Sequence, residues 1–351
     1  MTQRENLLSL LKRKGFDFIP PQFDLCPALE KRFREETGAE NYYDYYEFPW
    51  RFAPDLEPAN GGVEKYEPYL PRMAAGSYID AWGVGHEPSP NSMHMSYMHH
   101  PLKDIHSKEE ILSYPFPDYS NAHNPGQAEE IQKIHDRGLA AVGGMQCTIW
   151  ETAWYLRSME ELMMDMISGD EKAEILLDHV TALNTARAEA FVRSGVDILY
   201  IGDDIGMQHS IMMSEELYCE WIKPRLKGLI AAAKAINPEL VVLYHSCGYV
   251  VPFIPHLMEA GIDVLTPLQS ECMEFQKIHE EYGDVLSFHG TIGTQTIMPF
   301  GTPQEVREAV FRNLDLCGSQ GGLMVAPTHL LEPEVPYANI EAYVQACRDY
   351  K

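Results

Sequence analysis

Short runs of apolar, often β-branched residues alternate with segments of helical periodicity along the C-terminal two thirds of the chain. Six such runs follow one another, at 139–144, 196–204, 241–248, 263–269, 285–291 and 322–329. The segments between them have helix signals, as in 214–236, where Ser214 is a suitable N-cap before two acidic residues. Buried strands that alternate with helices are typical of parallel βαβ units. The pattern therefore predicts an α/β fold with a parallel sheet.

Two further stretches bring the predicted strand count close to eight, the number that closes a barrel of alternating strands and helices. They are residues 18–24 and the Trp- and Tyr-rich segment 78–100. A chain of 351 residues fits one such domain. We therefore predict a single (β/α)8 TIM barrel over 1–351, with 40–130 as an irregular N-terminal insertion rich in Pro, Tyr and Gly.

Polar side chains end five consecutive predicted strands. They are Asp203 and Asp204, His245 and Cys247, Gln269, His289, and Thr328 with His329. The active site of a TIM barrel lies at the C-terminal face of its strands. We therefore expect these side chains to meet at one mouth of the barrel.

The sharpest local motif is His-Ser-Cys-Gly at 245–248. Residues i and i+2 of a strand point the same way, so the imidazole of His245 and the thiol of Cys247 face one point. Nitrogen and sulfur ligands suit tetrahedral Zn²⁺. His329 is the predicted third ligand, and Gln269, Glu271 or the substrate is a candidate fourth. The alternative is a hydrogen-bonded histidine beside an inert buried cysteine.

Asp203 and Asp204 are neighbours at a strand end, so at most one of them faces the mouth directly. Asp204 and His289 are the predicted proton donors. Predicted substrate contacts come from polar and aromatic residues near the strand ends and from the insertion: Asp203, Gln208, Trp150, Glu151, Tyr97, Gln269 and Gln295. Aromatic rings can form a pocket wall or a cage for a methylated cation. Simple core packing is the alternative for the aromatic residues.

The net charge of the chain limits the classes of partner that it is expected to bind. Asp and Glu total 52 against 27 Lys and Arg, which gives a formal net charge of −25. Nucleic acids and anionic membranes both need a basic surface, so neither is an expected partner. The seven cysteines are scattered, and we find neither a signal-peptide stretch nor an apolar run long enough to span a membrane. We expect a soluble cytoplasmic protein with reduced thiols.

Several longer motifs occur in a specific order over nearly the whole chain. They include YIDAWGVG (78–85), DILYIGDDIGMQ (197–208), YHSCGYVVPFIPHLMEAGIDVLTPLQ (244–269) and FHGTIGTQ (288–295). Together they resemble the uroporphyrinogen decarboxylase superfamily. The resemblance implies a (β/α)8 barrel, in agreement with the strand pattern.

The resemblance also implies a choice between two chemistries. The decarboxylases of the superfamily bind a polycarboxylate tetrapyrrole through an arginine-bearing N-terminal segment, where this chain has Asp24 and Leu25. Some corrinoid-dependent methyltransferases of the superfamily bind zinc through HxC and a later Cys. His245 and Cys247 match the HxC, and His329 falls near the place of the later Cys.

The second branch is the better match. It implies a zinc-assisted methyltransferase that moves a methyl group between a small O- or N-methylated compound, or a thiol, and a corrinoid carried by a partner protein. Decarboxylation of a tetrapyrrole is the alternative. The direction of transfer stays open.

Overall fold

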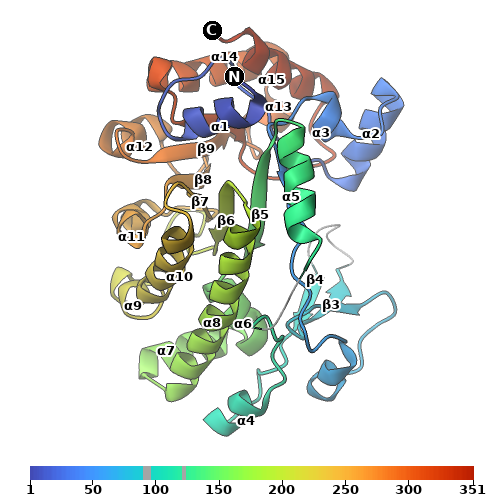
Figure 1. Cartoon of the computed structure of the whole chain (residues 1–351), viewed down its shortest axis with the longest axis vertical. Helices are drawn as coiled ribbons and strands as arrows, with labels where there is room; N and C mark the ends of the chain where they lie inside the picture. Colours follow the sequence, from blue (N-terminus) through green and yellow to red (C-terminus); the bar gives the residue numbers. More distant parts are fainter. Residues whose placement is uncertain (90–95, 121–123) are drawn as a thin grey trace.

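The computed structural model describes residues 1–89, 96–120 and 124–351, and a parallel sheet of seven strands lies at its centre (Figure 1). The order across this sheet is β1-β5-β6-β7-β8-β9-β10, so from β5 onward each strand pairs with the next one in the chain. The strands are β1 (Trp50–Phe52), β5 (Ala140–Gln146), β6 (Ile198–Gly202), β7 (Val241–His245), β8 (Val264–Leu268), β9 (Ser287–Ile292) and β10 (Leu323–Pro327).

The two edges of this sheet curl toward each other, as in a TIM barrel. Leu25 forms a parallel bridge with Leu331, just after β10. The ring of Trp50 on β1 lies 5.7 Å from the ring of His289 on β9. The predicted TIM-barrel-like fold is thus confirmed. The predicted strand at 18–24 is wrong, because this segment contributes the single bridge at Leu25 in place of a strand.

Helices surround the sheet on its outer side (Figure 1). The longest, α8 (Glu171–Ser194), begins at an Asp170 N-cap and ends at Gly195 in the left-handed conformation. The others are α1 (Gln3–Leu11), α2 (Pro27–Thr37), α3 (Tyr42–Tyr45), α4 (Lys108–Ser113), α5 (Gln127–Asp136), α6 (Trp150–Arg157), α7 (Met159–Ser168), α9 (Glu215–Trp221), α10 (Lys223–Ile236), α11 (Ile254–Ala260), α12 (Phe275–Tyr282), α13 (Ile297–Phe300), α14 (Pro303–Cys317) and α15 (Tyr337–Asp349). Among the described helices, none combines the length and apolar character that a membrane span requires.

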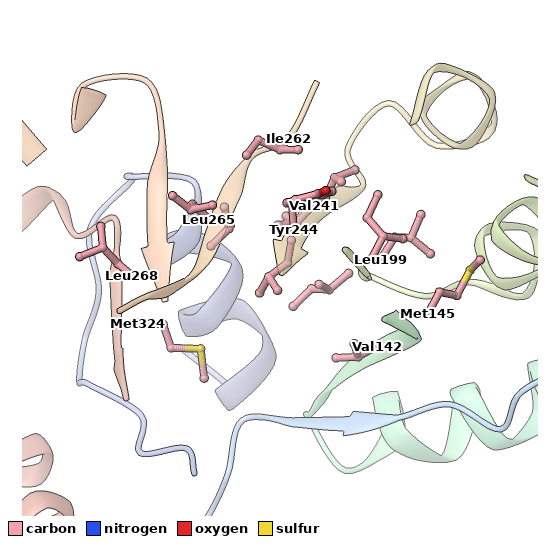
Figure 2. Packing of buried hydrophobic residues seen from close by; sticks show 14 of the residues in the cluster. Val142, Met145, Leu199, Val241, Tyr244, Ile262, Leu265, Leu268 and Met324 are labelled. Carbon is pink, nitrogen blue, oxygen red and sulfur yellow. The ribbon is translucent and has the colours of Figure 1, made fainter. Parts of the chain in front are cut away.

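The core fills the space inside the sheet and between the sheet and its helices. Every residue of β8, β9 and β10 is buried, which explains why these strands read as continuous apolar runs and not as alternating ones. Val142, Leu199, Leu265 and Met324, from four different strands, belong to this cluster (Figure 2). The rigid core fixes where each strand ends, and hence where its terminal polar residue lies.

The segment 40–130, predicted as an insertion, contributes strands to two different sheets. Strands β2 (Tyr78–Ile79), β3 (Gly85–Pro88) and β4 (Ser96–His99) form a separate antiparallel sheet, with β3 and β4 at the lower right of Figure 1. The prediction that 78–100 adds a barrel strand is therefore wrong, and residues 90–95 of it lie outside the described residues. By contrast, β1 lies within the supposed insertion yet pairs with β5 in the main sheet.

Candidate functional site

The C-terminal ends of the central strands surround two adjoining cavities. The outer cavity measures about 670 Å³ and is lined by polar residues from five strand ends or the loops that follow them, among them Asp204, Gln208, Cys247, Gln269, Gln295 and His329. The inner cavity measures about 310 Å³ and extends between His245, His289 and Tyr200. Thr328, His329 and Leu330 line both. The structure therefore brings most of the predicted site residues to one mouth.

Three potential metal ligands cluster where the two cavities meet. One ligand atom each of Asp204, His245 and Cys247 lies within 4.8 Å of the other two. His245 Nε2 is 3.5 Å from Cys247 Sγ and 3.6 Å from Asp204 Oδ1. All three residues are half-buried. A nitrogen, a sulfur and an oxygen thus converge on one point that remains accessible from the mouth.

The backbone around this cluster is held by close contact between two loops. The Cys247 amide donates to Asp204 Oδ1 at 2.7 Å, and the Gly248 amide donates to Gln269 Oε1 at 2.8 Å. A Cβ at Gly206 would lie 2.7 Å from the Cys247 carbonyl oxygen. A Cβ at Gly248, where φ is +84°, would lie 2.7 Å from the Met207 carbonyl oxygen. Glycine at both positions lets the β6 and β7 loops touch, which places Asp204 beside Cys247.

Tyr200 orients the imidazole of His245. Its hydroxyl lies 3.2 Å from His245 Nδ1, which leaves Nε2 to face Cys247 and Asp204. Burial lowers the pKa of His245, and the charge of Asp204 partly opposes that shift. The neutral imidazole favoured by burial is the form that binds metals. Sequence reasoning missed Tyr200, although strand alternation puts it on the same face as Asp204.

His329 does not belong to the ligand cluster. It is exposed at the rim that the two cavities share, and among the described residues Asp204 takes the third position that the sequence assigned to His329. The predicted fourth ligands are also engaged elsewhere. Gln269 accepts from the Gly248 amide through its Oε1, and Glu271 accepts from the Gln295 amide at 2.9 Å.

Asp203 is buried and lines neither cavity, so its position does not support the substrate contact that the sequence predicted. Its side chain is fully buried, and it accepts hydrogen bonds from the amides of Ile149 and Glu151 at the start of α6. Burial, then the charge of Glu151, raises the pKa of Asp203, whereas the amide donors lower it. Of the two neighbouring aspartates, only Asp204 lines a cavity.

Glu151 lies behind Asp204 and lines neither cavity. Its carboxylate accepts from the Asp204 amide at 3.0 Å and from the Tyr155 hydroxyl at 3.1 Å. Burial, then the charge of Asp204, raises the pKa of Glu151 to about 7. Glu151 thus supports the Asp204 backbone and is not placed to contact a ligand directly.

His289 forms part of the inner cavity wall. Its Nδ1 lies 2.7 Å from Thr266 Oγ1 and its Nε2 lies 2.9 Å from Gln22 Oε1. Burial, then His245, lowers the pKa of His289 to about 3. A neutral ring with both nitrogens hydrogen-bonded has no spare proton, so this geometry disfavours the predicted role as proton donor.

The remaining predicted residues divide between the mouth and the rest of the molecule. Gln208 Nε2 donates to Gln295 Oε1 at 3.2 Å, which joins the β6 and β9 loops at the outer cavity. Trp150 is fully buried in α6, and Tyr97 is 65% exposed on β4. Neither aromatic residue lines a cavity. The substrate contacts predicted for Trp150 and Tyr97 are therefore not supported.

Comparison with known proteins agrees with this architecture. The fold is similar to a methyltransferase from Methanosarcina mazei, with a TM-score of 0.69 and 19% identity over 99% of this chain and 98% of that one. An endo-β-1,4-xylanase from Gloeophyllum trabeum gives a TM-score of 0.39 and 11% identity over 65% of this chain and 81% of that one. No curated protein sequence matches the chain. Residues 81–350 match the family described as uroporphyrinogen decarboxylase (URO-D), and the chain belongs to that family.

Proposed function

We propose that this protein is a methyltransferase that moves a methyl group between a small O- or N-methylated compound, or a thiol, and the corrinoid of a separate protein, with zinc at the barrel mouth. The observation that carries the proposal is the cluster of Asp204, His245 and Cys247 ligand atoms within 4.8 Å of one another. Membership of the URO-D family and the fold shared with the Methanosarcina mazei methyltransferase support it.

The chemistry of the donor set fits zinc. Zinc in proteins takes nitrogen, sulfur and oxygen ligands, and a catalytic site commonly offers three protein ligands and one open position. His245, Cys247 and Asp204 supply these three atoms beside the outer cavity. Zinc bound there would supply Lewis acidity toward the oxygen or sulfur atom that carries the methyl group.

The residues of the chain itself position the reactants. In the demethylating direction the bond from heteroatom to methyl breaks, and its electron pair stays on the heteroatom. The nucleophile, reduced cobalt of the partner's corrinoid, supplies the pair for the new bond to carbon. Gln208, Gln269 and Gln295 line the outer cavity with amide groups that can hydrogen-bond a neutral ligand. Asp204 also faces this cavity. The sequence predicted it as a proton donor, but a carboxylate that binds zinc is not free to donate a proton, so the role proposed for Asp204 is that of a ligand.

The lining of the cavities disfavours the alternative, a tetrapyrrole decarboxylase. No lysine or arginine is among the described residues that line either cavity, whereas Asp24, Asp204, Glu332 and Glu334 are. A substrate with many carboxylates would meet like charge at each of these positions.

Metal content and methyl transfer test the proposal separately. We expect about one zinc per purified chain, lost in Cys247→Ala and retained in the matched variant Cys317→Ala. Cys317 is the last residue of α14 and lies outside both cavities. Reduced corrinoid with a panel of methylated donors should develop methyl-cobalt absorbance only with active protein. Metal-free, folded protein would contradict the zinc site. Release of CO₂ from uroporphyrinogen without corrinoid would contradict the methyltransferase.

A further inference from the structure

The inner cavity has one carboxylate, Asp24, and no opposing lysine or arginine among the described residues that line it. Its other polar groups are hydroxyl, amide and imidazole side chains. Burial, then His245, lowers the pKa of His289 to about 3, so that ring is neutral near pH 7. Asp24 is therefore the acidic group of the inner wall, and no lysine or arginine among the described lining residues neutralises its carboxylate.

Asp24 is held in place beside the bridge that residue 25 forms. The bridge partner of residue 25 is Leu331, after the end of β10. The backbone carbonyl of Asp24 accepts from the Leu331 amide at 2.8 Å, and its Oδ1 accepts from the Tyr43 hydroxyl at 3.2 Å.

The side chain of Asp24 is exposed to the cavity, although the surrounding walls shield it from bulk water. This burial raises the pKa of Asp24, whereas hydrogen bonds from Tyr43 and Gln22 and the nearby His329 act to lower it. A cationic ligand beside Asp24 would favour the ionised carboxylate in the same way. Among the described residues of the cavity wall, His329 is a group of opposite potential charge that acts on Asp24. A shielded carboxylate without a lysine or arginine partner gains from a cationic ligand.

The route to Asp24 also has negative charge. Asp204, Glu332 and Glu334 line the outer cavity, which shares Thr328, His329 and Leu330 with the inner one. A cleft lined by one sign of charge raises the local concentration of ligands of the opposite sign. The formal net charge of −25 acts in the same direction.

We propose that the inner cavity recognises a positive charge on the methyl donor and that Asp24 is the residue that selects it. This inference rests on the proposed function only for the identity of the ligand as a methyl donor. A volume of about 310 Å³ suits a small metabolite. Tyr200, which lines the same cavity, adds an aromatic side chain of the kind that favours a neighbouring ammonium group.

The charge need not reside on the methylated atom itself. An ammonium group beside Asp24 leaves the rest of the ligand to extend toward His245, which lines the same cavity and belongs to the ligand cluster. Where a quaternary nitrogen does carry the methyl group, the nitrogen–carbon bond breaks with its electron pair kept by nitrogen. The product is then a neutral amine, and no proton has to move.

Binding of a matched pair of probes tests the inference without any methyl transfer. Choline and 3,3-dimethylbutan-1-ol have the same shape and differ in the positive charge, and titration calorimetry or ligand-observed NMR gives their dissociation constants. We expect the wild-type protein to bind choline at least about tenfold more tightly than the neutral alcohol, because only choline pairs with Asp24. Equal binding of the two probes, or no binding of either, would overturn the inference.

Variants assign the preference to Asp24. Asp24→Asn should lose the preference for choline, whereas Glu40→Gln removes the same formal charge from an exposed residue outside both cavities and should retain it. Tyr43→Phe keeps the carboxylate and should also retain it. A preference for choline that survives in Asp24→Asn would show that Asp24 does not select the positive charge. If Asp24→Asn does not fold, the wild-type comparison still decides. Choline preference without methyl transfer to corrinoid would defeat the proposed function and leave the charge selection intact.

Discussion

The orientation of one imidazole depends on a residue that is not itself a potential ligand. Tyr200 contacts His245 Nδ1 at 3.2 Å, and this contact determines that Nε2 faces Cys247 and Asp204. When Nε2 binds a metal, Nδ1 carries the proton and donates it to the tyrosine oxygen. Partners of this kind fix the tautomer and rotation of a metal-binding histidine.

Tyr200→Phe removes this hydrogen bond and keeps the ring. We expect the affinity for zinc to fall by about 10- to 100-fold, because the imidazole is then free to rotate. Competition with a chromophoric chelator measures the affinity directly. Tyr249→Phe is the matched control, since Tyr249 follows the same His-Ser-Cys-Gly loop and the partner of His245 Nδ1 is the hydroxyl of Tyr200. Equal zinc affinity in Tyr200→Phe and wild type would show that Tyr200 does not orient the ligand.

At the scale of elements, the sequence predicted that β6 and β7 end in polar residues. It did not predict which residues form the cluster of potential metal ligands. An apolar run that ends in Asp-Asp or His-Ser-Cys indicates a strand end at the barrel mouth whatever lies around it. Which of Asp203 and Asp204 faces the cavity depends on the start of α6, whose amides bind Asp203. The sequence could not place His329 relative to His245, because that distance depends on how the sheet curls.

The segments that close the barrel could not be identified from the sequence, for a related reason. Strand β1 has three residues, too few for a pattern of alternation to be recognised. The closing contact after β10 is a single bridge at Leu25, which depends on tertiary packing and leaves no periodic signal. Tyr97 was predicted at the mouth because its segment is rich in aromatic residues, but antiparallel pairing with β3 places it in the separate sheet.

The carboxylate of Asp203 holds α6 against the end of β6. Asp203→Asn replaces one acceptor oxygen with an NH₂ group, which at the position of Oδ2 would face the Ile149 amide. We expect the free energy of unfolding to fall by about 2–3 kcal/mol, because a buried amide donor then faces another donor in place of its acceptor. Urea denaturation measures this loss. Asp170→Asn at the partly exposed N-cap of α8 is the matched control and should cost about 1 kcal/mol or less. Equal losses in the two variants would contradict the structural role of Asp203.

At the scale of the whole molecule, the free energy of unfolding depends on pH because the native fold disfavours protonation of one buried histidine. His289 has a pKa lowered to about 3 by burial, then by His245, whereas a histidine in the unfolded chain titrates near its ordinary value of about 6.5. Between these two values the unfolded chain binds a proton that the native protein does not bind. The free energy of unfolding must therefore fall as the pH falls through this window, by up to about 1.4 kcal/mol per pH unit for one group.

His289→Gln should remove this dependence while it retains a polar side chain between Thr266 and Gln22. Because the neutral form of His289 is the native one, its contribution is fully present above pH 6.5 and is progressively lost below it. We therefore expect the urea midpoints of wild type to decline more steeply from pH 7.5 to pH 5 than those of His289→Gln. His209→Gln, at an exposed position of the mouth loop, should follow the wild-type slope. Parallel slopes for His289→Gln and wild type would mean that His289 takes up a proton in the folded protein, and the inner cavity would then carry positive charge beside Asp24.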